Sequence, residues 1–190
     1  NLEFALSYSS MEDLLPKGVL LIGAPGSGKT TLARILCDQA DIPFESFGNA
    51  DFGSSYVNQT AINLQKIFDQ AGYPIKKGLV PASMLFIDEI DTIGRIRGDN
   101  DTEGAKVVTT MCVNMNGHKN VDGVIVIGAT NRVDIIDPAL LRPGRFDEII
   151  EMGYPDKEEI KEIYKVHIGK RNRNSRKEIF SGIDYDSLGR

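Results

Sequence analysis

The chain has 190 residues, of which 41% are hydrophobic and 26% charged, a balance typical of a globular protein with a buried core. Acidic residues outnumber basic ones by 27 to 22, so a nucleic-acid groove is not the first expectation. No apolar run approaches the roughly 20 residues that cross a bilayer, and no signal peptide opens the sequence. Cys37 and Cys112 lie within apolar helical patterns without metal-ligand spacing, which favours free core thiols in a reducing compartment.

Short apolar runs alternate with helical periodicities, the pattern of a parallel sheet flanked by helices. Strands are predicted at residues 19–22, 43–47, 84–87, 124–127 and near 148–151. Helices are predicted at 29–40, at 61–71 with Gly72 as the stop, and around 108–115. The apolar side of the first helix is expected to comprise Leu32, Ile35, Leu36 and Ala40. The order of elements predicts an α/β fold, a three-layer α/β/α sandwich around a five-stranded parallel sheet.

A boundary is predicted at residues 153–156, because Pro155 disfavours helix in the residue before it and Asp156 can cap a following helix. We therefore expect one unit over residues 1–153 and a second, helical one over 154–190. The basic run at 170–177 contains no interleaved aromatic residues, so it indicates a solvated loop rather than a nucleic-acid patch. The sequence opens at Asn1 rather than Met, and we expect it to be part of a longer protein.

Residues 23–30 read Gly-Ala-Pro-Gly-Ser-Gly-Lys-Thr and match the phosphate-loop pattern, with a buried strand predicted before them and an amphipathic helix after. The glycines let successive backbone N–H groups face phosphate oxygens. Lys29 is expected to reach the outer phosphates of a nucleotide, and the hydroxyl of Thr30 to bind Mg²⁺. The predicted nucleotide-binding residues of this region are Pro25, Gly26, Ser27, Gly28, Lys29, Thr30 and Thr31.

Two acids, Asp88 and Glu89, follow the predicted buried strand at 84–87. Asp88 is expected to face the nucleotide and its Mg²⁺, while Glu89 is suited to polarise a water for attack on the γ-phosphate. A GTPase or a protein kinase fits less well, because the sequence has neither a guanine-reading Asn-Lys-x-Asp nor a His-Arg-Asp catalytic loop.

Polar residues also follow the strand predicted at 124–127. Asn131 is an uncharged donor that can hold the attacking water or touch the γ-phosphate. Arg142 comes eleven residues later and Arg145 three residues after that, on a turn that contains Pro143 and Gly144. Arginine stabilises phosphate charge in a transition state, whether the same chain or a neighbour supplies it. The predicted catalytic residues are therefore Glu89, Lys29, Asn131, Arg142 and Arg145.

In this order, the motifs resemble the AAA family of ring ATPases: the phosphate loop, Asp-Glu-Ile-Asp at 88–91, Ala-Thr-Asn-Arg at 129–132, and Asp-Pro-Ala-Leu-Leu-Arg-Pro-Gly-Arg-Phe-Asp at 137–147. The resemblance implies a P-loop NTPase with ATP and Mg²⁺ bound between the subunits of a homo- or hetero-hexamer. Asn131 would be its first sensor, and Arg142 and Arg145 the fingers that reach a neighbouring site. Residues 1–153 would be the large nucleotide-binding subdomain and 154–190 a truncated helical lid, with Ile163 and His167 near the base or ribose.

The family also grips polypeptide through an aromatic–hydrophobic–glycine triplet in the central pore. Here the matching place reads Tyr56-Val57-Asn58, so Tyr56 and Val57 are the predicted substrate contacts and Asn58 replaces the glycine. Within the family, residues 85–95 and this Tyr-Val pair most resemble the FtsH-type proteases. The sequence has no His-Glu-x-x-His zinc-protease pattern, so any peptidase activity is expected to lie outside it.

The leading hypothesis is an ATP-hydrolysing, Mg²⁺-dependent motor module that unfolds, translocates or remodels proteins. A nucleotide-gated structural subunit with little hydrolysis, assembled in a hetero-oligomeric AAA complex, is one alternative. A DNA-handling ring ATPase is another, which the net charge of −5 disfavours. The expected partners are other AAA subunits and a polypeptide substrate, with no nucleic acid and no membrane segment in this sequence. A membrane anchor elsewhere in a longer protein stays open.

Overall fold

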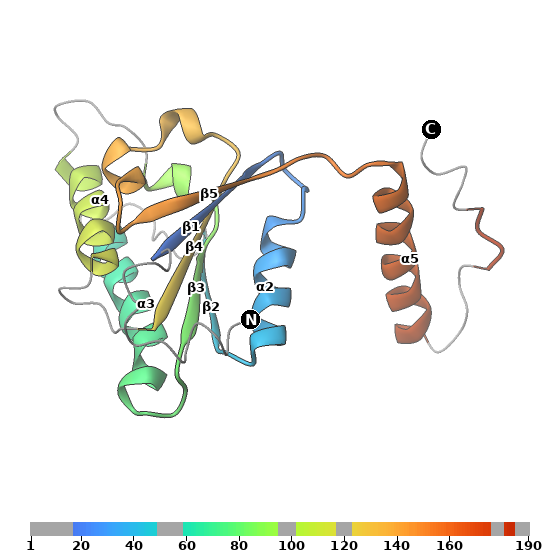
Figure 1. The fold of residues 1–190 in the computed structure, drawn as a ribbon, viewed down its shortest axis with the longest axis horizontal. Coiled ribbons are helices and arrows are strands. Elements are labelled where there is room, and N and C mark those ends of the chain that lie inside the picture. The colour runs from blue at the N-terminus through green and yellow to red at the C-terminus, as the bar shows by residue number, and fades with distance from the viewer. Residues whose placement is uncertain (1–16, 49–58, 95–101, 117–122, 176–180, 185–190) are drawn as a thin grey trace. The chain divides into compact units, whose positions relative to one another are not determined.

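The computed structural model describes residues 17–48, 59–94, 102–116, 123–175 and 181–184 (Figure 1). The chain divides into two compact units, Asn1–Met152 and Gly153–Arg190. The larger unit holds the sheet with its helices, and the smaller one holds a single described helix.

Within the described residues, the sheet has five strands, all parallel, in the order β2-β3-β4-β1-β5 (Figure 1). The strands are β1 (Gly18–Gly23), β2 (Phe44–Phe47), β3 (Ser83–Ile87), β4 (Val124–Thr130) and β5 (Phe146–Met152). This confirms the predicted five-stranded parallel sheet, and β5 extends beyond the predicted 148–151. The phosphate-loop strand β1 lies between β4 and β5, so the strands that carry the predicted acids and Asn131 are its near neighbours.

Helices cover both faces of the sheet, as the α/β/α prediction requires. On β1, Leu20 packs with the core of one face and Leu21 with the core of the other. Helices α3 (Gln59–Lys76) and α4 (Thr102–Met115) supply Leu64 and Met111 to the Leu20 side, while α2 (Lys29–Ala40) supplies Cys37 to the Leu21 side. Figure 1 shows α2 on one side of the sheet and both α3 and α4 on the other.

The buried side of α2 differs in part from the predicted apolar stripe, of which Leu32 packs against the core. Its fully buried residues are Ala33 and Cys37, whereas Ile35 and Leu36 are 47% and 42% exposed. The side that faces the sheet thus carries small side chains at 33 and 37, so hydrophobicity alone does not determine which side of the helix is buried.

Helix α3 passes through Gly72, the predicted stop, and ends at Lys76. Gly72 is buried, so packing against the sheet overrides the weak helix propensity of glycine. The terminating residue is Gly78, whose φ of +66° is left-handed. Its N–H donates to the Ile75 carbonyl at 2.8 Å, and the Leu79 N–H donates to the Pro74 carbonyl at 3.0 Å. These two bonds form a Schellman motif, the usual glycine-dependent helix end.

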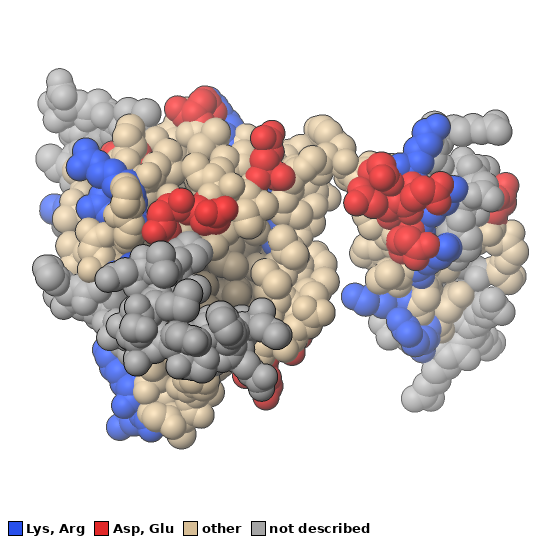
Figure 2. All heavy atoms as spheres, viewed as in Figure 1, with Lys and Arg blue, Asp and Glu red and all other residues tan. Residues whose placement is uncertain are grey.

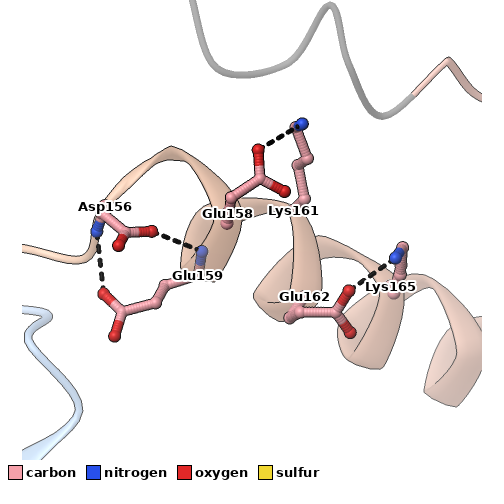
Figure 3. Close-up of polar contacts among 6 residues, drawn as sticks. All are labelled: Asp156, Glu158, Glu159, Lys161, Glu162 and Lys165. Carbon is pink, nitrogen blue, oxygen red and sulfur yellow. Dashed lines mark hydrogen bonds and ion pairs between the residues drawn. The ribbon is translucent and has the colours of Figure 1, made fainter.

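The smaller unit contains α5 (Lys157–Asn174), whose N-cap is Asp156, as predicted. The helix extends through residues 170–174, so the prediction of a loop over this part of the basic run is wrong. The Asp156 carboxylate accepts the Glu159 N–H at 2.8 Å, and the Glu159 carboxylate accepts the Asp156 N–H at 2.8 Å, a reciprocal capping box (Figure 3). One turn on, Lys165 donates to Glu162, a hydrogen bond that raises the pKa of Lys165. Figure 2 shows basic and acidic side chains side by side on this helix.

Candidate active site

The phosphate loop has the backbone that an anion site needs. Gly26 and Gly28 have φ values of +81° and +93°, a conformation that residues with a side chain rarely adopt. The Ser27 N–H donates to the Ala24 carbonyl at 3.2 Å, which closes the loop, and Gly28 is the N-cap of α2. The loop therefore leads directly into the N-terminus of a 12-residue helix, where unpaired N–H groups and the helix dipole favour phosphate.

Lys29 lies over this loop. Its Nζ donates to the carbonyls of Gly23 at 2.7 Å and Ala24 at 3.0 Å, and to Ser27 Oγ at 3.4 Å. A flexible ammonium held by three neutral acceptors can exchange some of them for phosphate oxygens, which are charged and bind it more strongly. The loop thus keeps the lysine next to the place where phosphates would bind.

Thr30 and Asp88 come from α2 and from the end of β3, 58 positions apart, and meet in the same place. Thr30 Oγ1 donates to Asp88 Oδ2 at 3.3 Å. A hydroxyl and a carboxylate oxygen are hard ligands, and Mg²⁺ in proteins is typically held by one or two such groups together with water and phosphate oxygens. The donor set therefore fits Mg²⁺.

Glu89 has an unusual backbone conformation. Its φ of +48° and ψ of +48° are left-handed, which costs a non-glycine residue roughly 1–2 kcal/mol. Its N–H donates to Asp88 Oδ1 at 3.0 Å, and its carbonyl accepts the Thr92 hydroxyl at 2.9 Å. Strained residues of this kind cluster at functional sites, and here the strain turns the chain sharply after β3 so that Glu89 lines a pocket.

That pocket has a volume of about 370 Å³, within the usual range for small-molecule sites. It opens at the carboxyl ends of β1, β3 and β4, where open α/β sheets bind ligands. The structure brings together there, as lining residues, the predicted Pro25, Gly26, Gly28, Lys29, Thr30, Thr31, Asp88, Glu89 and Asn131. Ser27 is joined to the site through its hydrogen bond with Lys29.

Three residues of this region had no predicted role. Ala129 and Thr130 also line the pocket, and Asp91 bonds to Thr130 from the turn after β3. Their motifs, Asp-Glu-Ile-Asp and Ala-Thr-Asn, were the available signal. Spacing along the chain does not show that these two motifs touch, because their contact depends on β3 and β4 being adjacent in the sheet.

The two predicted arginine fingers do not line this pocket. They lie on the turn between η3 (Pro138–Leu141) and β5. The guanidinium of Arg145 donates through Nη1 to the Ala139 carbonyl and also donates to the side-chain amide oxygen of Asn116. Arg142 is exposed.

Asp147 accepts the N–H groups of Gly144 at 3.3 Å and Gly18 at 3.4 Å, so it joins this arginine-bearing turn to the start of β1. The turn is therefore tied to the sheet, and it presents Arg142 to solvent while Arg145 is held by its own chain.

The remaining predicted residues are not placed at the site. Tyr56, Val57 and the neighbouring Asn58 lie outside the described residues. Ile163 and His167 are both exposed on α5, in the smaller unit. Their predicted contacts with substrate and nucleotide stay predictions.

The predicted free core thiols are confirmed: Cys37 and Cys112 are both buried, and neither forms a disulfide. Burial raises the pKa of each thiol, so both favour the protonated, unreactive form. None of the described helices is long and apolar enough to cross a membrane.

Comparison with known proteins gives the family. The family model for the "ATPase family associated with various cellular activities (AAA)" matches residues 19–154, well over half of the chain. The chain is 39% identical to the "ATP-dependent zinc metalloprotease FtsH" of Alkalihalophilus pseudofirmus, over 95% of the chain and 28% of that protein. It is 46% identical to the protein of the same name from Rhodothermus marinus, over 84% of the chain and 23% of that protein. The chain spans less than a third of the length of these two relatives. Because the family model covers most of the chain, the chain is an ATPase module that belongs to the AAA family.

Proposed function

We propose that the pocket binds ATP with Mg²⁺ and hydrolyses it as one site of a multi-subunit protein-unfolding motor. The observation that carries the proposal is the convergence of a phosphate loop, a hydroxyl–carboxylate pair, a glutamate and an asparagine in one pocket of about 370 Å³. These are the parts that phosphoryl transfer to water requires, since its catalysis is mainly positioning and charge stabilisation.

In this proposal, the triphosphate lies against the N-terminus of α2, and Lys29 exchanges loop carbonyls for phosphate oxygens. Thr30 and Asp88 would hold the metal ion, whose charge offsets that on the phosphate oxygens. Glu89 orients the attacking water and accepts its proton as the new bond to the γ-phosphorus forms and the bond to the ADP oxygen breaks. Asn131 donates a hydrogen bond to that water or to the γ-phosphate.

Arg142 and Arg145 would complete the site of a neighbouring subunit. Their place outside their own pocket supports this role, because a residue that serves its own nucleotide would line the pocket that holds it. Arg142, which is exposed, is available as it stands, whereas Arg145 must first release Ala139 and Asn116. A closed ring, a hexamer in our hypothesis, would give every subunit such a neighbour.

The proposed substrate is a polypeptide. The relatives named above are ATP-dependent proteases by name, and an ATPase that acts with a protease has unfolding and translocation as its natural tasks. Tyr56 and Val57 would contact the polypeptide, and Ile163 and His167 of α5 would approach the base or ribose. The protease activity of the relatives would require residues beyond those of this chain, which has no His-Glu-x-x-His pattern.

A subunit-mixing experiment tests the shared site. Glu89→Gln subunits keep their fingers but lack the proposed base, and Arg142→Ala subunits keep the base but lack a finger. Each variant alone is expected to lose at least about 10²-fold in ATP turnover. When they are mixed, a site with Glu89 beside a neighbour with Arg142 forms, and turnover should recover to a measurable fraction of the wild-type rate. Full wild-type turnover by Arg142→Ala alone would refute the shared site.

A further inference from the structure

The hydroxyl of Thr130 makes two hydrogen bonds although the residue is only 2% exposed. Its Oγ1 donates to Asp91 Oδ1 at 2.7 Å and accepts the backbone N–H of Arg132 at 2.9 Å. The second bond spans Asn131 and closes a turn around it, a common use of a threonine hydroxyl. Thr130 therefore fixes the direction in which the chain leaves β4, and with it the position of Asn131.

Asp91 belongs to the turn that holds Glu89. This turn is η1 (Ile90–Thr92), and the Glu89 carbonyl accepts both the N–H of Thr92 at 2.8 Å and its hydroxyl at 2.9 Å. These two bonds close the tight 3₁₀ turn across Ile90 and Asp91, so they link Asp91 to the backbone of Glu89. A displacement of Asp91 consequently displaces the backbone of Glu89, two residues away.

The Asp91–Thr130 bond connects the continuations of two adjacent strands. The paired register of β3 and β4 runs as far as Ile87 and Gly128, so the residues that follow need other contacts. Packing supplies one of them: Ile90 is fully buried, and its Cδ1 lies 3.1 Å from where a Cβ would stand on Gly128. The hydrogen bond supplies a second contact, with defined direction, next to the pocket.

We propose that Asp91 and Thr130 are a positioning pair that sets the separation of Glu89 and Asn131 in the pocket. This inference deepens the proposed function and rests on it. The pair would act through Glu89 and Asn131, the two residues proposed to contact the attacking water, and not through the phosphate loop. Breaking the pair should therefore lower the rate of hydrolysis and leave the affinity for ATP nearly unchanged.

Two variants break the hydrogen bond and two keep it. Thr130→Val removes the hydroxyl at almost constant shape, and Asp91→Ala removes the acceptor; Thr130→Ser keeps the hydroxyl, and Asp91→Asn keeps an oxygen that can accept it. A misplacement of about 1 Å at a reacting group can cost ~10²-fold in rate, so the two breaking variants should lower kcat by ~10- to 100-fold. Thr130→Ser and Asp91→Asn should stay within about threefold of wild type, because the bond survives.

The full-length protein is the sample, with kcat from steady-state ATP turnover and the Kd of ATP from equilibrium binding. Thr130→Val combined with Asp91→Ala should cost no more than Thr130→Val alone, since the valine already removes the bond to Asp91 together with the bond from the Arg132 N–H. Thr109→Val is the matched control, because that hydroxyl donates to the Ala105 carbonyl on the exposed side of α4, away from the pocket. If Thr130→Val does not fold, the Asp91 variants carry the test.

The positioning pair would be established if kcat falls in the two breaking variants while their Kd for ATP stays within about threefold of wild type. Thr130→Ser and Asp91→Asn should then retain the wild-type kcat to within about threefold. Wild-type kcat in both breaking variants would overturn it, as would a parallel loss of ATP affinity. A wild-type protein that binds ATP without turnover would instead refute the proposed function, so the two failures are distinguishable.

Discussion

The left-handed backbone of Gly28 makes a quantitative prediction about the phosphate loop. Its φ is +93°, and a Cβ added there would meet nothing within 4 Å, so the cost of Gly28→Ala is conformational and not steric. The left-handed region costs an alanine roughly 1–2 kcal/mol. We therefore expect Gly28→Ala to lower the free energy of unfolding by about 1–2 kcal/mol, which lowers the Tm of a domain of this size by about 2–8 °C.

Gly48→Ala is the matched control in the same unit. Gly48 is outside the left-handed region, and its added Cβ would lie 3.9 Å from the Cβ of Asp88, an ordinary contact. This variant should stay within about 0.5 kcal/mol of wild type. Thermal unfolding followed by far-UV circular dichroism, without nucleotide, compares the three proteins. Equal stability of wild type and Gly28→Ala, or equal loss in both variants, would refute the reasoning from backbone conformation.

Three further predictions follow from the site and the core. Glu89→Gln keeps the backbone N–H bond to Asp88; it should bind ATP with near wild-type affinity in a filter-binding assay and lose ~10²- to 10⁴-fold in turnover. Lys29→Ala should weaken ATP binding itself in the same assay, and unchanged affinity would contradict its proposed contact with phosphate. Because burial raises the pKa of Cys37 and Cys112, their thiolate fraction at pH 8 lies below that of a free cysteine; a thiol reagent should label both thiols rapidly in denaturant and slowly in the native protein, and rapid native labelling would contradict their burial.

Much of the fold follows from local patterns. Continuous apolar runs predicted buried parallel strands because a strand covered on both faces has no polar alternation to display. The phosphate loop was recognisable because its chemistry needs glycine at fixed places beside a lysine and a hydroxyl. Asp156 was recognisable as a cap for the same kind of reason, since a short side-chain oxygen is needed before a helix begins.

The errors arise where packing overrides local preference. Gly72 does not end α3 because it is buried, and the left-handed turn that ends the helix is six residues later at Gly78. The buried side of α2 carries the small residues Ala33 and Cys37, while the larger Ile35 and Leu36 are exposed. The sequence alone does not show which of these residues the sheet buries.

The candidate site shows the same division. Most of the pocket-lining residues of the motifs, and the chemistry expected of each, were predicted from the sequence because both depend on residue type and on the order of the motifs. The contact between Asp91 and Thr130 was not, because it depends on the adjacency of β3 and β4. The engagement of Arg145 with Ala139 and Asn116 was likewise invisible, since these partners come from different elements.

The most direct test of the account is ATP turnover per subunit, measured against protein concentration with Mg²⁺, for the full-length protein and its Arg142→Ala variant. If neighbouring subunits complete each site, specific turnover of the wild type should rise with concentration as subunits assemble. Arg142→Ala should stay at the low turnover of unassembled subunits, ~10³-fold or more below the assembled wild type. Specific turnover that is independent of concentration and equal in the two proteins would contradict a site shared between subunits.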